Sequence, residues 1–351
     1  MSLLPIEAIR DGIASEPSIF PQNIDLARQA VLFLLLDEAA LRSASFLDDR
    51  ILSPQLQGRW VRFAEIGPWL PLIGPRHRLN FIFHAGHVGS TLISRLLDDI
   101  EGVLGLREPL PLRVLATAFD EMDALHALAG PAEWKMLLDL HLACWGRGYA
   151  KTQSVVVKAT SSASPICQPI FDRLPEARAL LLNLEPEPYL ASLLAGENSY
   201  LDLRAQAQGR MRRLTRMAPS QVRPLHDLSL GEIAAMTWTV ETLSHRTVEQ
   251  RFGERLLRVD FDAFLEAPGD TLRKICAHFR LKAPDAYFSD VEANPTLARY
   301  SKAQEHAYTP TLRRQILAAS RTTNIVEISK GLAWIDAFAQ QFPALGTMLL
   351  A

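Results

Sequence analysis

The sequence predicts an α/β fold in which a mostly parallel β-sheet lies between two layers of helices. Three observations support this: short apolar segments alternate with helical segments from Arg76 onward, polar residues follow several apolar segments directly, and the composition is that of an ordinary globular protein. Alternating strands and helices are typical of a parallel sheet covered on both faces. Because ligands in such folds bind beyond the carboxyl ends of the strands, the residues after each strand are site candidates.

The expected strands of this sheet are short and apolar: Leu79–His84, Val103–Arg107, Ser154–Lys158, Ala177–Leu184 and Arg255–Phe261. Between them, Pro131–Trp145 is expected to be a helix with proline in its first turn. Leu230–Phe252 is expected to be a helix that begins with a capping box of Ser229 and Glu232.

Residues 1–75 are predicted to form a small N-terminal accessory unit of α+β structure, and residues 76–351 the main domain. Val31–Leu36 and Gly58–Ile66 are the expected strands of this unit, and Glu38–Ser45 its short helix. The boundary is placed near Pro75, the last of three closely spaced prolines.

The overall charge argues against whole classes of partner. The 351 residues are 48% hydrophobic and 22% charged, with a net charge of −2. This composition is ordinary for a globular protein and gives no global field that would attract nucleic acid or an anionic membrane. An anionic ligand must therefore be held by local groups.

The cysteines and apolar runs predict a soluble, cytoplasmic protein. The three cysteines are isolated and form no CxxC pair, which fits a reducing compartment and argues against a zinc site. The longest apolar run near the start, Ala30–Leu36, is much shorter than a bilayer span, and the first residues are acidic where a leader would be basic.

The first strand of the main domain is followed by a glycine-containing turn, His84-Ala85-Gly86-His87-Val88-Gly89, and then by Ser90 and Thr91. Leu92, Ile93, Leu96, Leu97 and Ile100 then repeat at helical spacing. Such a loop points several N–H groups inward at the positive end of a helix, which is a geometry that binds phosphate. A plain strand-to-helix turn without a ligand is the alternative.

The loop differs from the ATP-type pattern GxxxxGK[ST] at two positions, since His84 replaces the first glycine and Ser90 replaces the lysine. Three further strand ends carry polar residues. Glu108 precedes Pro109, Lys158 precedes Ala-Thr-Ser-Ser, and the fourth strand leads into a helix that bears Ser192. Four consecutive strand ends along the chain thus offer a phosphate loop, an acid, a lysine and a hydroxyl.

With these motifs, most of residues 76–305 resembles the P-loop sulfotransferases of the bacterial kind. The segments that carry the resemblance are FIFHAGHVGSTLISRLLDDIEGVLGLREP at 81–109, VVVKATSS at 155–162, RALLLNLEPEPYLASLL at 178–194, RVDFDAFLEAPGDTLRKICAHFRL at 258–281 and ARYSKAQEHAY at 298–308. The resemblance implies a P-loop NTPase-like three-layer α/β/α fold. It also implies transfer of a sulfuryl group from 3′-phosphoadenylyl sulfate (PAPS) to a hydroxyl or amine.

The resemblance implies roles for individual residues. The 5′-phosphosulfate would be bound by the loop, namely Gly86, His87, Val88, Gly89, Ser90 and Thr91. Glu108 would be the general base, Lys158 would stabilise charge on the bridging oxygen, and His87 could assist as an acid or donor. The alternatives are that Glu108 pairs with Arg107 or Arg113 at the surface, that Lys158 reaches solvent, and that His87 serves only loop packing.

Two positions depart from the family's pattern. His87 stands where the family has lysine or arginine, and Leu184 stands where an arginine shares the 3′-phosphate with the serine at Ser192. Arg204, Arg210 or Lys302 would then replace the missing cation, or the nucleotide differs. Otherwise the basic helix Leu203–Arg216 is interpreted as a solvated face. His84 is expected to be structural, and no metal is expected, because the histidines have no metal-ligand spacing.

The preferred function is therefore a PAPS-dependent sulfotransferase acting on an unidentified small-molecule or peptide acceptor. Its acceptor pocket is expected within Leu110–Gly148 and part of the N-terminal unit. Two alternatives stay open. One is a non-catalytic nucleotide-binding or scaffold protein of the same fold, and the other is a P-loop kinase, against which Ser90 in place of lysine counts. The oligomeric state is not predicted.

Overall fold

The computed structural model of the chain describes residues 2–74, 77–219, 223–298 and 309–350. Its main sheet is formed by β5 (Arg78–His84), β6 (Val103–Arg107), β7 (Ser154–Lys158), β8 (Arg178–Asn183) and β9 (Leu256–Asp260). The order across the sheet is β6-β7-β5-β8-β9, and every pairing is parallel. The predicted parallel sheet is thus confirmed, and each predicted strand lies within one residue of the observed bounds.

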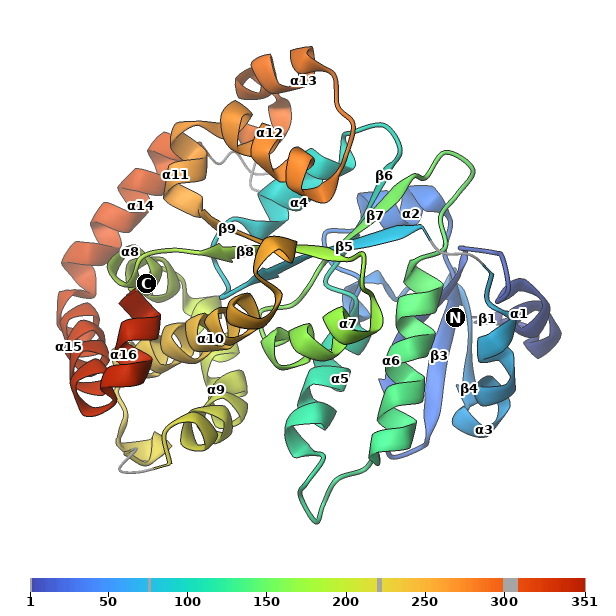
Figure 1. The fold of residues 1–351 in the computed structure, drawn as a ribbon, viewed down its shortest axis with the longest axis horizontal. Coiled ribbons are helices and arrows are strands. Elements are labelled where there is room, and N and C mark those ends of the chain that lie inside the picture. Colours follow the sequence, from blue (N-terminus) through green and yellow to red (C-terminus); the bar gives the residue numbers. More distant parts are fainter. Residues whose placement is uncertain (1, 75–76, 220–222, 299–308, 351) are drawn as a thin grey trace.

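The strands alternate between two hydrophobic cores, one on each face of the sheet. In β5, Phe81 and Phe83 belong to one core and Ile82 to the other. The first core contains side chains of α5 (Leu110–Glu121), α6 (Pro131–Trp145) and α7 (Cys167–Arg173). The second contains side chains of α4 (Ser90–Asp98), α8 (Pro186–Leu194), α10 (Leu230–Phe252) and α12 (Pro268–Phe279). The predicted three-layer α/β/α fold is therefore confirmed (Figure 1).

Both helix starts named from the sequence are confirmed. Pro131 occupies the first turn of α6. At the start of α10, the Ser229 amide donates to the Glu232 carboxylate at 2.8 Å, and the Glu232 amide donates to the Ser229 hydroxyl at 3.4 Å.

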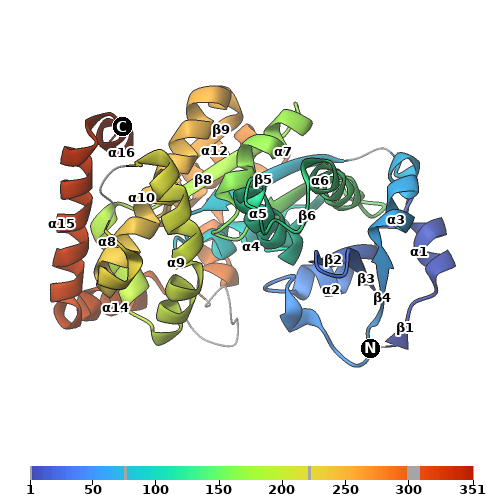
Figure 2. The same cartoon turned by 90° about the horizontal axis from the view of Figure 1, so that it is seen from below.

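The N-terminal residues form a second, four-stranded sheet at one end of the molecule, with the order β1-β4-β3-β2 (Figure 2). Its strands are β1 (Ser2–Leu3), β2 (Ile19–Asp25), β3 (Ala30–Leu35) and β4 (Gln57–Arg62), and its helices are α1 (Ile6–Gly12), α2 (Glu38–Ser43) and α3 (Phe63–Ile66). The prediction of one strand over Gly58–Ile66 is wrong in its second half, because Phe63–Ile66 is helical.

The N-terminal sheet shares the first core of the main sheet. Val31 and Phe33 of β3 belong to the same buried cluster as Phe81 and Phe83 of β5. Pro75, the predicted boundary, lies outside the described residues, and the division into two domains stays a prediction.

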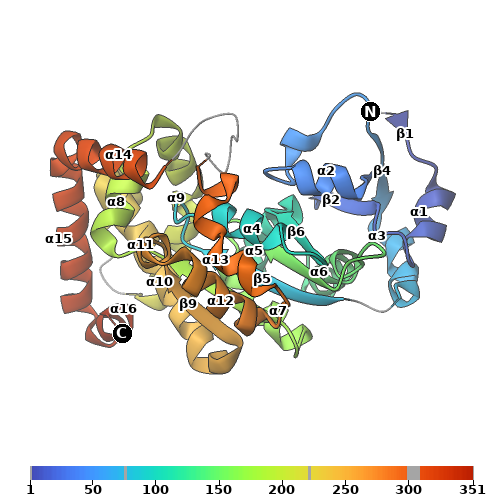
Figure 3. The same ribbon diagram turned by 90° about the horizontal axis from the view of Figure 1, so that it is seen from above.

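The C-terminal helices lie at the opposite end of the molecule from the N-terminal sheet (Figure 3). They are α14 (Pro310–Thr323), α15 (Ile325–Gln341) and α16 (Pro343–Leu350). Helix α15 crosses α10 closely, since a Cβ on Gly231 would lie 1.9 Å from the Glu327 carbonyl oxygen. Helix α14 packs beside α8 through a 2.7 Å hydrogen bond from Ser320 Oγ to the Ala191 carbonyl. The remaining helices are α9 (Glu197–Met217), α11 (Phe261–Glu266) and α13 (Asp285–Ser289).

Candidate active site

The loop between β5 and α4 has the left-handed backbone that turns successive amides inward. The φ angles are +95° at Gly86, +56° at His87 and +69° at Gly89. Helix α4 begins immediately afterwards at Ser90, and the amides of a first helical turn have no partner within the helix. A run of left-handed residues at a helix N-terminus is an anion-binding geometry.

Gly89 is required at its position for two reasons. Its φ of +69° is costly for residues with a Cβ. In addition, a Cβ on Gly89 would lie 1.9 Å from a ring carbon of Phe261, the first residue of α11. The Phe261 ring therefore packs directly against the loop, and only glycine permits this approach.

His84 ties the loop to the neighbouring strand end. Its Nδ1 accepts from the Gly86 amide at 3.0 Å, and its Nε2 lies 2.8 Å from the Ala159 carbonyl just beyond β7. Since a carbonyl can only accept, Nε2 carries the proton and the ring is the neutral Nε2–H tautomer. This arrangement agrees with the structural role expected for His84.

Glu108 and Lys158 meet at the ends of the adjacent strands β6 and β7. Lys158 Nζ donates to Glu108 Oε1, and the pair is largely removed from solvent, with 0% of the Lys158 side chain exposed and 13% of the Glu108 side chain. Glu108 also has a φ of +49°, a backbone strain that clusters at functional sites. Of the two alternative partners, Arg107 is instead paired with Asp98 at 3.0 Å. Lys158 does not reach solvent.

The segment after β7 faces the loop. A Cβ on Gly86 would lie 3.4 Å from Ser161 Cβ, so the two backbones pass close together. Ser162 Oγ is buried without a hydrogen-bond partner in the described part of the chain, and so is Thr91 Oγ1 at the start of α4. Buried hydroxyls without protein partners are costly unless a ligand or water satisfies them. These two atoms are therefore candidates for ligand contacts.

A buried charge cluster lies behind this segment. Glu241 of α10 is fully buried and accepts hydrogen bonds from Arg210 Nε at 2.9 Å, from Arg213 Nη2 at 2.8 Å and from the Ser164 hydroxyl. Burial acts to raise the pKa of Glu241, but the charges of Arg213 and Arg210 and the hydrogen bonds outweigh it and lower the pKa to about 2. Arg210 Nη2 also lies 3.4 Å from Ser161 Oγ, which links the cluster to the site.

This cluster corrects the interpretation of the basic helix. Arg210 and Arg213 are 3% and 5% exposed, so this part of α9 is an interior face. Both guanidinium groups are engaged by Glu241, which makes Arg210 a poor substitute for the missing phosphate cation. Sequence reasoning missed Glu241 because nothing in α10 marks it as different from a surface glutamate.

Leu184, which stands where the family's pattern has a phosphate-binding arginine, is part of the hydrophobic core. Leu184 is 2% exposed, and its carbonyl accepts from Trp238 Nε1 at 2.9 Å. Ser192 lies beside the loop, with its hydroxyl 3.4 Å from the His87 carbonyl. Arg204 is exposed on α9, and Lys302 lies outside the described residues.

Arg313 of α14 is a cation near the loop that sequence reasoning missed. It is 7% exposed, its guanidinium lies 5.2 Å from the centre of the Phe261 ring, and it pairs with Asp262 at 2.5 Å. Its Nη2 is buried without a partner among the described residues. A buried, half-satisfied guanidinium next to the ring that covers Gly89 suits an anionic ligand. No local motif distinguishes Arg313 from the exposed Arg314.

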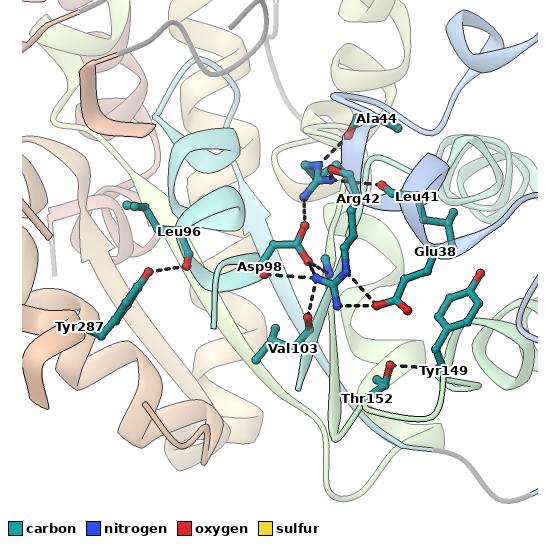
Figure 4. Close-up of polar contacts among 12 residues, drawn as sticks. Glu38, Leu41, Arg42, Ala44, Leu96, Asp98, Val103, Tyr149, Thr152 and Tyr287 are labelled. Carbon is teal, nitrogen blue, oxygen red and sulfur yellow. Dashed lines mark hydrogen bonds and ion pairs between the residues drawn. The ribbon is translucent and has the colours of Figure 1, made fainter. Parts of the chain in front are cut away.

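The edge strand β6 is joined to the N-terminal unit by Asp98. Asp98, at the end of α4, binds the guanidinium groups of Arg42 at 2.7 Å and Arg107 at 3.0 Å, and Figure 4 shows its contact with Arg42. The Gly105 amide also donates to Asp98 at 2.8 Å. Arg107 in turn donates to the carbonyls of Leu41, Arg42 and Ala44. The strand that delivers Glu108 is thus fixed from both sides.

No group of three or more histidine, cysteine, aspartate or glutamate side chains within the described ranges could hold a metal ion. The three cysteines are buried thiols. Among the helices of those ranges, none combines the length and the apolar character that a bilayer span requires.

No protein-family model matches the chain, and no curated protein does. Several solved structures are similar to it. A sulfotransferase domain from the curacin biosynthetic pathway is 14% identical, with 69% of this chain and 87% of that chain covered and a TM-score of 0.39. The sulfotransferase STF9 from Mycobacterium avium is 15% identical, with 74% and 80% covered and a TM-score of 0.40. Mouse sulfotransferase SULT7A1, solved with PAP, is 9% identical, with 76% and 92% covered and a TM-score of 0.33. Likenesses at this level carry no conclusion about function.

Proposed function

We propose that this chain is a sulfotransferase that moves a sulfuryl group from PAPS to a hydroxyl or amine of a small-molecule or peptide acceptor. The observation that carries the proposal is the Glu108–Lys158 pair, which lies at two adjacent strand ends of the sheet whose central strand leads into the glycine loop. An acid and a lysine beside an anion-binding loop are the groups that in-line transfer of an anionic group to a hydroxyl requires.

The loop residues suit the phosphosulfate end of PAPS. The amides of Gly89, Ser90 and Thr91 belong to the left-handed turn and first helical turn, and the buried Thr91 hydroxyl has no partner in the described residues. In the segment after β7, the buried Ser162 hydroxyl has none either. Amides and hydroxyls at a helix N-terminus bind phosphate without a loop lysine, so His87 does not exclude the ligand.

Arg313 is the proposed cation for the 3′-phosphate. It would replace the arginine that the sulfotransferase family has at the position of Leu184. Arg313 stacks on the Phe261 ring, which packs against Gly89 of the loop. The Ser192 hydroxyl lies within hydrogen-bond distance of the His87 carbonyl of the same loop. An arginine fork and a hydroxyl together can bind a phosphate dianion. Arg204 and Lys302 remain the earlier alternatives for this role.

The residues divide the chemistry between them. Glu108 accepts the acceptor's proton as the new bond between oxygen and sulfur forms. The bond between sulfur and the bridging oxygen breaks, and Lys158 stabilises the electron pair that leaves on adenosine 3′,5′-bisphosphate (PAP). Glu108 and Lys158 form an ion pair with each other. Binding of both substrates would separate them and make each available for its own role.

Calorimetric titration of PAP and of adenosine 5′-monophosphate tests the nucleotide assignment. We expect PAP to bind more tightly than the monophosphate, and Arg313→Gln to remove about tenfold or more of this preference. Arg314→Gln, which changes the exposed neighbour, is the matched control. If PAP does not bind, the PAPS assignment is wrong.

Turnover of PAPS with a library of hydroxyl and amine acceptors separates the remaining alternatives. Release of PAP that depends on Glu108 supports a sulfotransferase. If PAP binds and no acceptor is sulfated, the non-catalytic nucleotide-binding alternative is favoured. If the chain instead transfers phosphate from ATP, it is a kinase.

A further inference from the structure

One segment of the N-terminal unit lies directly against the end of β6. The Leu47 amide donates to the Arg107 carbonyl at 2.7 Å, and the Leu110 amide donates to the Leu47 carbonyl at 3.1 Å. Arg107 Nε also donates to the Ala44 carbonyl at 2.7 Å. Residues 44–47 are thus bonded to Arg107 and Leu110, which lie before and after Glu108 in the sequence. The residues that follow are thereby fixed next to the candidate base.

Phe46 of this segment lies beside Lys158, and Arg50, three residues beyond the segment, stacks on Phe46. Phe46 is 9% exposed, and Lys158 Nζ lies 5.9 Å from the centre of its ring. The guanidinium carbon of Arg50 lies 3.5 Å from the same ring centre. Stacking of this kind holds an arginine in one orientation and reduces the entropy lost when it binds a ligand.

Arg50 has one edge occupied and one edge open. Its Nε and Nη2 bind the Asp48 carboxylate, with the shortest contact at 2.5 Å, and its Nη1 has no hydrogen-bond partner in the described residues. The side chain is 59% exposed. Burial acts to lower the pKa of Arg50, but the hydrogen bond to Asp48 and the charges of Asp48, Glu108 and Asp202 outweigh it and raise the pKa. Arg50 is therefore a permanent cation close to Glu108.

We propose that Arg50 binds an anionic oxygen group of the acceptor, a carboxylate or an ester of phosphate or sulfate, while Glu108 takes the proton from the acceptor's hydroxyl. This inference rests on the proposed function. The free end of a guanidinium matches the two oxygens of such a group. Because Asp48 and the Phe46 ring fix the guanidinium, the distance between the anionic group and the reacting hydroxyl would select among acceptors. The N-terminal unit is then part of the acceptor site.

The test compares matched acceptors on the full chain with PAP or PAPS bound. The probes are hydroxyphenyl carboxylates with spacers of increasing length, each beside its neutral carboxamide. For the spacer that fits, we expect kcat/KM for the carboxylate to exceed that for its amide by about tenfold or more, with most of the difference in KM. Arg50→Gln should remove the preference for the carboxylate over its amide, whereas Arg50→Lys should keep part of it.

Arg28→Gln is the control, because Arg28 is an exposed arginine of the same unit that pairs with Asp25. Calorimetric binding of the same probes to the PAP-bound protein provides a second readout. The inference is overturned if the protein shows no preference for any carboxylate over its amide, or if Arg50→Gln retains the preference. Failure to bind PAP would instead overturn the proposed function, so the two failures are distinguishable.

Discussion

Glu108 and Lys158 are joined twice, once through their side chains and once through their backbones. The Lys158 ammonium donates to the Glu108 carboxylate, and the Glu108 amide donates to the Lys158 carbonyl at 2.7 Å. In the parallel pairing of β6 with β7, Arg107 lies opposite Lys158. The backbone bond from Glu108 extends this pairing by one residue. The register of two parallel strands therefore brings the acid and the lysine together.

The pair predicts a strong energetic coupling. Replacing Lys158 by Met leaves the Glu108 carboxylate in a mostly buried position without its ammonium partner, at a cost of about 3–5 kcal/mol. The double variant Glu108→Gln/Lys158→Met should cost clearly less than the sum of the two single changes. Denaturant unfolding of the four proteins measures this coupling, and additive costs would contradict it.

In turnover, Glu108→Gln should lower kcat about 10²- to 10⁴-fold with little change in PAP affinity.

Gly89 provides a test of the loop. Gly89→Ala places a Cβ against the Phe261 ring and onto a φ of +69°, so we expect PAP affinity to fall at least tenfold and the melting temperature to drop. Gly67→Ala is the control, since a Cβ there meets nothing within 4 Å. Adding Phe261→Ala should recover only part of the loss, because it removes the clash and leaves the backbone strain. Normal PAP binding by Gly89→Ala would show that the loop does not hold the nucleotide.

The main sheet could be predicted because its information is local. Each strand is an apolar run bounded by polar or turn residues, so the pattern alone gave bounds correct to within one residue. The N-terminal unit was harder to predict. Strand β2 contains a proline, an asparagine and a register shift between Pro21 and Asn23, and no strand was predicted there. Phe63–Ile66 continues an alternating pattern and is nevertheless helical.

The site was only partly predictable for a related reason. Residues at strand ends can be found from the sequence, because the fold class alone places them at one edge of the sheet. Arg213, Glu241 and Arg313 owe their position to contacts between helices distant in sequence. A single sequence contains no signal that pairs a basic residue of α9 with an acidic residue of α10. The cation beside the loop therefore had to be found in three dimensions.

Asp98 is predicted to be a main anchor of the N-terminal unit. Asp98→Ala removes the acceptor of Arg42, of the fully buried Arg107 and of the Gly105 amide, and we expect a loss of about 3–5 kcal/mol in the free energy of unfolding. Asp11→Ala, which removes an exposed pair with Arg10, should change stability by less than about 1 kcal/mol. Hydrogen exchange should accelerate at residues 41–47 in Asp98→Ala. If those amides stay protected, Arg107 alone holds the segment.

Two buried histidines predict a loss of stability under mild acid. Burial lowers the pKa of His141 and of His245 from 6.5 to about 4. Because an unfolded histidine binds a proton near pH 6.5 and the folded one does not, the stabilising contribution is present above pH 6.5 and is lost as the pH falls toward 4. Each group accounts for roughly 3 kcal/mol over this range at 1.36 kcal/mol per pKa unit. The Glu241 carboxylate adds a separate loss only below about pH 4.5.

His141 allows this origin to be tested. Its Nδ1 lies 2.7 Å from the Leu137 carbonyl and so carries the proton, whereas its buried Nε2 has no partner in the described residues. His141→Leu should therefore cost little at pH 8, since it removes an unsatisfied polar atom, and should be more stable than the parent at pH 5. Unfolding free energies measured between pH 5 and pH 8 would then show a shallower slope for His141→Leu than for the parent. His226→Gln, which changes an exposed histidine, is the control variant. Equal slopes for the parent and His141→Leu would show that His141 does not cause the acid sensitivity.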